Sequence, residues 1–237
     1  MNKRAAFASS ILLVCSAAAA DTLNDNIDAV FADIDTDSQP GCAAGVIHNG
    51  EYIHKAGYGL ANLEHGIPIT SQSVFRTGSV GKQFTAMSIA ILAERGELDL
   101  DADVHDYLPD LVDYGHEVTV RQMVHHFAGM GDYDHEIFTN PDGSDFRFGN
   151  EDFWTIEQFY RKVAQAGLSH PPASKWQYSN LGYFLLAHVV ESVSGESLRQ
   201  FAAREIFARL GMNDSLFNDN VNQPVPNRAD GYQLMDD

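Results

Sequence analysis

The alternation of hydrophobic and polar positions changes its period several times along this 237-residue chain. In residues 21–34, apolar side chains recur at spacings of three and four, which predicts an amphipathic helix. The next segment, GCAAGVIHNGEYIHKAGYG, predicts two strands joined by Asn49 and Gly50, a dipeptide that tolerates the positive φ angles of a two-residue hairpin turn. We therefore expect a helix and an antiparallel hairpin at the start of the folded chain.

A helical region follows the hairpin. Residues 79–95 are apolar on nearly all sides after Gln83, so we expect a central, buried helix with Gly96 as its C-terminal cap. Four further helices are predicted, in residues 119–128, 155–166, 180–194 and 196–210. We therefore expect a fold that mixes helices and strands (α/β in the broad sense) and that belongs to the α+β class. Strands that would complete the sheet are not evident, and a two-stranded hairpin is marginal by itself.

The first twenty residues differ from the rest of the chain. Two basic residues precede an apolar run, and small residues then lead up to Ala20. This order is typical of a secretory signal peptide, so we expect residues 1–20 to be removed and residues 21–237 to be secreted or periplasmic. A transmembrane anchor would need about 20 apolar residues, and a lipoprotein anchor at Cys15 would need a small residue in place of Val14. No stable membrane anchor is expected.

The charge of the chain excludes one class of partner. The chain has 33 acidic residues and only 15 Lys and Arg, so its net charge is -18. This negative charge disfavours binding to nucleic acid. An acidic surface suits a protein that works in salt, and it equally suits an ordinary well-solvated surface. The oligomeric state cannot be read from this pattern.

Ser79 and Lys82 form the first candidate chemical pair. They lie three residues apart in TGSVGKQFTA, so both fall on one face of the helix predicted there. At a helix N-terminus the dipole stabilises an attacking oxygen, and a desolvated lysine could lose its proton and take one from the serine hydroxyl. The alternative is that Ser79 caps the helix while Lys82 points into water. A lysine in the first turn of a helix opposes the helix dipole, which counts against simple capping. At this point both interpretations, a catalytic pair and a capped helix, stay open.

Tyr178 and Asn180 form the second candidate pair, in KWQYSNLGY ahead of another apolar helix. Tyr178 could pass a proton between the serine and a leaving group, and Asn180 could hold a substrate carbonyl through its amide. The alternative is that Asn180 caps a helix beginning at Leu181 while Tyr178 packs against it. Motifs this short also occur by chance, so neither pair decides the matter alone.

Taken in order with their surroundings, the two motifs resemble the serine β-lactamase-related family. This family includes class C-type β-lactamases, D-alanyl-D-alanine carboxypeptidases and esterases of the same fold. The resemblance extends from about Gly41 to about Tyr232 and includes FRTGSVGKQFTA, TVRQMVHHFAGMGDY and WQYSNLGYFLLAHVVESVSG. It implies a β-lactamase/transpeptidase-like fold, with a mostly antiparallel sheet flanked by helices, a helical domain, and the site between them.

The resemblance also implies the roles of the four residues. Ser79 would be the acylated nucleophile, Lys82 its proton acceptor, Tyr178 the general acid and base, and Asn180 the side chain that positions the substrate. The implied substrate is a small molecule or peptide with an ester, amide or β-lactam bond, and the sequence does not choose among them. We expect no cofactor and no metal ion.

Two departures from the family pattern change the expectation. The family has Thr-His-Thr-Ser before a glycine, whereas this chain has His-His-Phe-Ala at 125–128 before Gly129, which removes the usual hydroxyl groups. The family's third motif, a Lys or His followed by a small residue and Gly on a late strand, has no counterpart before Asp237. That strand supplies one oxyanion-hole N–H, the other being that of Ser79. We therefore expect an N-terminal fragment, an incomplete domain whose C-terminal strands are missing.

Three alternatives were weighed against this interpretation. Five histidines between residues 105 and 135, with Asp132 and Asp134 nearby, suggest a metallohydrolase, but no H-E-x-x-H or H-x-H-x-D-H spacing occurs. The nucleophile elbow of an α/β-hydrolase needs a glycine where Thr77 stands. A non-catalytic penicillin-recognising or scaffold protein of the same fold stays open, because the third motif is missing.

The expected truncation gives a direct prediction. If the oxyanion strand and most of the sheet are missing, these 237 residues alone should be poorly folded and inactive. We expect the isolated chain to show no cooperative thermal transition by circular dichroism and no hydrolysis of a chromogenic ester or cephalosporin. Cooperative unfolding together with hydrolysis would refute this expectation.

Overall fold

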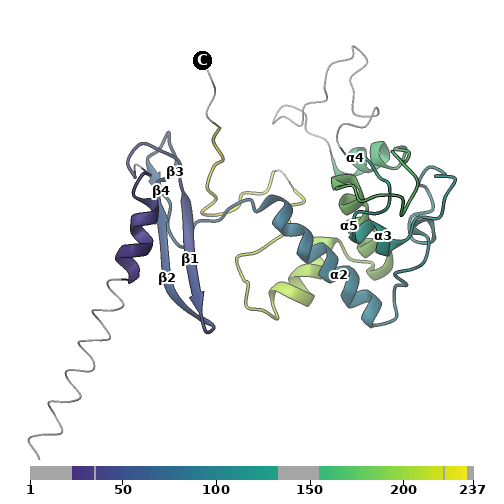
Figure 1. The fold of residues 1–237 in the computed structure, drawn as a ribbon, viewed down its shortest axis with the longest axis horizontal. Coiled ribbons are helices and arrows are strands. Elements are labelled where there is room, and N and C mark those ends of the chain that lie inside the picture. The colour runs from purple at the N-terminus through teal and green to yellow at the C-terminus, as the bar shows by residue number, and fades with distance from the viewer. Residues whose placement is uncertain (1–22, 35, 133–154, 221, 234–237) are drawn as a thin grey trace, which may run out of the picture. The chain divides into compact units, whose positions relative to one another are not determined.

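The computed structural model describes residues 23–34, 36–132, 155–220 and 222–233. The chain divides into two compact units, Met1–Arg76 with Pro224–Asp237, and Thr77–Gln223. We call them the hairpin unit and the helical unit and describe each by itself (Figure 1). The predicted signal peptide, residues 1–20, lies outside the described residues.

The hairpin unit confirms the first two predicted elements. Residues 23–28 are α-helical and continue into a 3-10 turn, Ala29–Phe31. Strands β1 (Cys42–His48) and β2 (Glu51–Tyr58) pair in antiparallel fashion. Asn49 and Gly50 between them have φ angles of 50° and 82°, so the dipeptide makes the turn for which its residue types are suited.

The hairpin unit also contains pairings that the sequence pattern did not predict. Two short strands, β3 (Leu60–Asn62) and β4 (Ile67–Pro68), form a second antiparallel pair. The backbone N–H of Val74 donates to the carbonyl of Asn227 at 2.9 Å, and the N–H of Ala229 donates back to Val74 at 2.9 Å. Among the described residues, strands therefore occur only as two two-stranded sheets.

The helical unit contains the rest of the described secondary structure. It begins with a 3-10 turn, Gly78–Gly81, that runs into α2 (Lys82–Glu94), and a second 3-10 turn covers Val104–Asp106. The remaining helices are α3 (Val120–Val124), α4 (Ile156–Val163), α5 (Asn180–Ser194) and α6 (Leu198–Ala202), the last continuing as a π-helical turn, Ala203–Phe207. All five segments of this unit that were predicted as helical thus contain a helix.

Helix α5 lies at the centre of the helical unit, where α2, α3, α4 and α6 all pack against it. Its buried face is a continuous apolar stripe that meets Ile89 and Leu92 of α2 and Phe201 of α6 in one core. The opposite face of α2 is exposed, with Met87 52% accessible. The expectation that α2 is buried on all sides is therefore wrong among the described residues, since only one of its faces meets the core.

Two predicted helix boundaries are wrong, and backbone conformation explains both. Gly78 has a φ of +51°, so the predicted α-helical start at Ser79 is a 3-10 turn and regular α-helix begins at Lys82. Helix α3 ends at Val124 because His126 takes a φ of +63°, which no right-handed helix can contain. Gly96 and Gly195 take φ angles of 70° and 71°, and the predicted cap at Gly96 is confirmed.

A buried carboxylate links α2 to the π-helical turn. Glu205 is only 4% exposed, and its Oε2 lies 2.6 Å from the guanidinium of Arg95, at the end of α2, and 2.6 Å from that of Arg209. The hydrogen bond from Arg95 is the main cause that lowers the pKa of Glu205, so the carboxylate stays ionised. This ion-pair cluster holds the C-terminal end of α2 against its neighbour. Within the described part of the chain, no helix has both the length and the apolar character needed to cross a bilayer.

The packing of α5 predicts the effect of one core substitution. Leu186 is fully buried, so Leu186→Ala should lower the free energy of unfolding by about 2–5 kcal/mol through lost burial and the cavity left behind. Urea-induced unfolding of the full-length protein, followed by circular dichroism at 222 nm, measures this change. Met87→Ala, a truncation on the exposed face of α2, is the control and should change it by about 0.5 kcal/mol or less. Equal effects of the two substitutions would contradict the core described here.

Candidate active site

Ser79 and Lys82 lie at the junction of the 3-10 turn and α2. In a 3-10 helix, residues three apart are eclipsed, so the two side chains leave the same side of the backbone. The ammonium Nζ of Lys82 lies 3.3 Å from Oγ of Ser79. The N-caps of the turn and of α2 are Thr77 and Gly81, and neither makes a side-chain cap. The alternative in which Ser79 caps a helix and Lys82 points into water is thus not what the structure shows.

Tyr178 joins this pair from a distant part of the sequence. Its hydroxyl donates to Oγ of Ser79 at 2.6 Å, across a separation of 99 residues. Nζ of Lys82 lies 4.8 Å from the centre of the Tyr178 ring and 5.6 Å from that of Tyr183, within the range of cation–π attraction. The serine hydroxyl therefore has a phenol and an ammonium beside it.

Asn180 completes the group through Lys82. Its Oδ1 accepts a hydrogen bond from Nζ of Lys82 at 2.6 Å, and its Nδ2 donates to the carboxylate of Asp132 at 3.0 Å. The cap of α5 is Ser179, whose Oγ accepts from the N–H of Gly182 at 2.9 Å. The alternative in which Asn180 caps α5 is therefore wrong. All four side chains selected from the sequence meet in the helical unit.

The charge of Lys82 shifts the acidity of Tyr178. Burial opposes ionisation of the phenol, but interaction with the Lys82 ammonium and the hydrogen bond to Ser79 together outweigh it. The pKa of Tyr178 consequently lies below its usual value of 10. The phenol donates to the serine oxygen at 2.6 Å, and its phenolate, which forms more readily here, is the form that could take a proton from that serine.

His126 lies in the site in a role that the sequence, which offered it only as a possible metal ligand, did not suggest. Its ring lies 4.7 Å from the ring of Tyr178 and 5.0 Å from that of Tyr183, measured between centroids. Its Nδ1 accepts from the backbone N–H of Ser179 at 3.2 Å. Burial, followed by the charge of Lys82, lowers the pKa of His126 below 6.5 and keeps the ring neutral. The sequence signals were its place among five closely spaced histidines and its position in the segment that departs from the family pattern.

Asp132 also enters the site in a role that the sequence did not suggest. The sequence placed it among candidate metal ligands, together with Asp134 and His135, which lie outside the described residues. Among the residues that the structure does describe, no group of three or more His, Cys, Asp or Glu side chains is arranged to hold a metal ion. The carboxylate of Asp132 instead accepts a hydrogen bond from Asn180.

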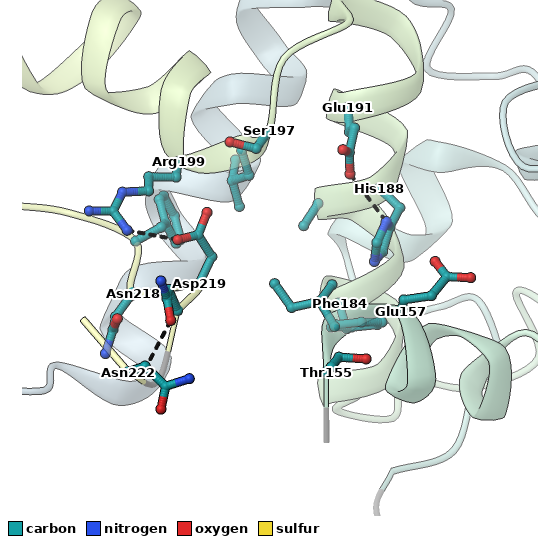
Figure 2. A pocket seen from close by; sticks show the side chains of 15 residues that line it. Thr155, Glu157, Phe184, His188, Glu191, Ser197, Arg199, Asn218, Asp219 and Asn222 are labelled. Atoms are coloured by element: carbon teal, nitrogen blue, oxygen red, sulfur yellow. Dashed lines mark hydrogen bonds and ion pairs between the residues drawn. The ribbon is translucent and has the colours of Figure 1, made fainter. Parts of the chain in front are cut away.

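A separate hollow of about 760 Å³ opens elsewhere in the helical unit, lined by residues of α4, α5 and α6 and by residues 217–220 and 222 (Figure 2). Phe184 and Phe217 contribute apolar walls. The Arg199–Asp219 ion pair at 2.7 Å borders the hollow, as does a contact of 3.4 Å between Nδ1 of His188 and the carboxylate of Glu191. None of the four candidate residues lines it. The hollow is therefore distinct from the group around Ser79.

Comparison with known proteins identifies the family. The chain belongs to the beta-lactamase family, whose model matches residues 27–236. It is 32% identical over 186 residues to penicillin-binding protein 4* of Bacillus subtilis, an alignment covering 77% of this chain and 39% of that protein. It is 35% identical over 190 residues to esterase EstB of Burkholderia gladioli, covering 75% of this chain and 47% of that protein.

The solved structures support the same fold. The octameric penicillin-binding protein homologue from Pyrococcus abyssi aligns with a TM-score of 0.69 at 30% identity, covering 83% of this chain and 44% of that one. The predicted β-lactamase/transpeptidase-like fold, with helices and antiparallel strands, is therefore confirmed. The chain spans less than half the length of each of these three relatives.

The environment of His126 predicts a pH dependence of stability. Its pKa is lower in the folded protein than in the unfolded chain, so the unfolded chain binds more protons as the pH falls below 6.5. The contribution of neutral His126 is complete above pH 6.5 and is lost as the pH falls toward the folded-state pKa. Urea unfolding at a series of pH values should show a shallower loss below pH 6.5 for His126→Gln than for the parent protein. His116→Gln, at an exposed histidine of the same unit, is the matched control. Identical slopes for His126→Gln and the parent would contradict this assignment.

Proposed function

We propose that this protein is a serine hydrolase that cleaves an ester, amide or β-lactam bond through a covalent acyl-enzyme on Ser79. One observation carries the proposal: Oγ of Ser79 accepts from the hydroxyl of Tyr178 at 2.6 Å and lies 3.3 Å from Nζ of Lys82. A serine becomes a nucleophile when a neighbouring base can remove its proton. The names of two relatives, a penicillin-binding protein and an esterase, support carboxylic acid derivatives as the substrate class.

The proposed reaction has two steps at one carbonyl carbon. In the first, a base takes the hydroxyl proton of Ser79 while Oγ forms a bond to the carbonyl carbon, and the resulting oxyanion collapses to expel the leaving group, which takes the proton from that base. In the second, water adds to the acyl-ester and Oγ of Ser79 leaves with a proton. The backbone N–H of Ser79 is one proposed donor to the oxyanion, since it lies in the first turn of a helix.

The geometry favours Tyr178, in its phenolate form, as the group that takes the proton from Ser79; the phenol first gives its own proton to solvent. Its oxygen is nearer to Oγ than Nζ of Lys82 is, at 2.6 Å against 3.3 Å, and its pKa is lowered. The positively charged ammonium of Lys82 then stabilises the phenolate. The role expected from the family resemblance, with Lys82 itself as the proton acceptor, is the second assignment, and it is supported by the same 3.3 Å contact.

Asn180 is proposed to hold both Lys82 and the substrate. Its Oδ1 is taken by Lys82, and Nδ2 carries two hydrogens, of which one is directed to Asp132. We assign the second N–H to a substrate carbonyl, which is the role expected from the sequence. We also propose that the protein is exported, a proposal supported by the signal-peptide pattern of residues 1–20.

The proposal predicts covalent labelling of one serine. A fluorescent fluorophosphonate or penicillin should label the full-length protein, and Ser79→Ala should abolish the label because the attacking oxygen is gone. Tyr178→Phe keeps the ring but removes the proton acceptor and should slow labelling by about 10²–10⁴-fold. In-gel fluorescence over time measures both effects.

Ser71→Ala is the control for these substitutions, because it removes another exposed serine hydroxyl. It should leave the labelling rate unchanged. Absence of any label on the parent protein would instead support the non-catalytic scaffold of the same fold. A label that persists in Ser79→Ala would show that a different nucleophile is used.

A further inference from the structure

We propose that Asp132 is a positioning residue of this site, whose carboxylate anchors the Asn180 side-chain amide with Oδ1 held against Lys82. This inference rests on the proposed function for its effect on rate, but its structural part does not. Asp132 acts through Asn180, to which it is joined by a hydrogen bond of 3.0 Å.

The chemistry of the three groups allows only one arrangement. A lysine ammonium can only donate hydrogen bonds, and an ionised carboxylate can only accept them. An asparagine amide has one end of each kind, and the two ends are nearly equal in size. Placed between Lys82 and Asp132, the Asn180 amide satisfies both neighbours only with Oδ1 toward Lys82 and Nδ2 toward Asp132, as observed at 2.6 Å and 3.0 Å.

Removal of the acceptor at position 132 would release this constraint. The Asn180 side chain would then be held only through Oδ1, and it could turn about its Cα–Cβ and Cβ–Cγ bonds away from the ammonium. Lys82 would lose its 2.6 Å bond and with it the contact that holds Nζ near Ser79 and Tyr178. A buried or half-buried donor without an acceptor is costly, so Lys82 would turn toward water.

The backbone fixes Asp132 in place. Gly129 has a φ of +79°, and a Cβ at this position would lie 2.1 Å from the carbonyl oxygen of His170, so only glycine fits. Met130 forms an antiparallel bridge with Leu168. The carbonyl of Gly131 accepts from Oγ of Ser179 at 2.8 Å. The loop that carries Asp132 is therefore held against the residue just before Asn180.

Ser179, the N-cap residue of α5, makes two different contacts with its one hydroxyl group. Oγ of Ser179 accepts from the N–H of Gly182 and donates to the carbonyl of Gly131. One contact begins the helix at Asn180, and the other brings the loop of Asp132 to that helix. The distance between Asp132 and Asn180 follows from these two contacts and not from the hydrogen bond between them alone.

The charge of Asp132 should affect the pH dependence of the reaction, which a role in packing alone would not do. Its negative charge raises the pKa of Tyr178 against the opposite effect of Lys82. Asp132→Asn keeps an oxygen that can accept from Asn180 but removes the charge, so the pKa of Tyr178 should fall further. The rate should then be retained while its pH dependence moves to lower pH.

The test compares two substitutions at position 132 in the full-length protein. We expect Asp132→Leu, which has similar size but no acceptor, to slow fluorophosphonate labelling of Ser79 by about 10-fold or more, equivalent to about 1.4 kcal/mol. Asp132→Asn should stay within about 2-fold of the parent at the pH of maximal rate, with the profile displaced to lower pH. Asp214→Leu, at an exposed carboxylate of the same unit, controls for the substitution itself.

A double-mutant cycle separates positioning from general structural support. If Asp132 acts through Asn180, Asp132→Leu should slow labelling no further in an Asn180→Ala background, within about 2-fold. Multiplicative effects of the two substitutions would overturn the inference. So would an Asp132→Asn variant as slow as Asp132→Leu, because an acceptor would then not suffice. If Asp132→Leu fails to fold by circular dichroism, the rate and pH profile of Asp132→Asn decide the matter.

A readout without activity distinguishes failure of this inference from failure of the proposed function. The side-chain NH2 signal of Asn180 can be identified in a ¹⁵N spectrum by its loss in Asn180→Ala. We expect its hydrogen exchange to be slow in the parent and in Asp132→Asn, and at least about 10-fold faster in Asp132→Leu. Unchanged exchange in Asp132→Leu overturns the inference. Absence of labelling in the parent, with the expected exchange pattern, refutes only the proposed function.

Discussion

The hydrogen bond between the Lys82 ammonium and Oδ1 of Asn180, at 2.6 Å, is the contact on which the site depends. It joins the first residue of α2 to the first residue of α5, so it exists only if the two helices pack with their N-terminal ends together. Their apolar faces provide this alignment, because Ile89 and Leu92 share one core with the buried face of α5. The chemistry of the site is thus set by helix packing.

A single positive charge in this position acts on two neighbours at once. The ammonium of Lys82 helps to lower the pKa of Tyr178 and also that of His126. For a phenol this shift favours the anion, and for an imidazole it favours the neutral ring. The same charge therefore prepares Tyr178 to receive a proton and keeps His126 able to accept from the N–H of Ser179. The site gains a proton acceptor while the residue packed beside it stays uncharged.

The local elements of this protein could be predicted with fair success, and the failures have physical causes. The hairpin turn at Asn49 and Gly50 and the cap at Gly96 follow from residues that accept positive φ angles. The exposed face of α2 was missed because a uniformly apolar segment does not reveal which side meets the core. The early end of α3 was missed because a positive φ at a histidine has no local signal.

The sequence by itself indicated the family and the four candidate side chains, Ser79 included, because short motifs and their order are written in residue types. It left open whether Asn180 or Ser179 caps α5, since both residue types cap helices well. Only the tertiary structure decided this, by placing the carbonyl of Gly131 beside Ser179 and the ammonium of Lys82 beside Asn180. The parts that His126 and Asp132 play were likewise invisible in the sequence, because each depends on contacts across about 50 residues that only the folded chain brings together.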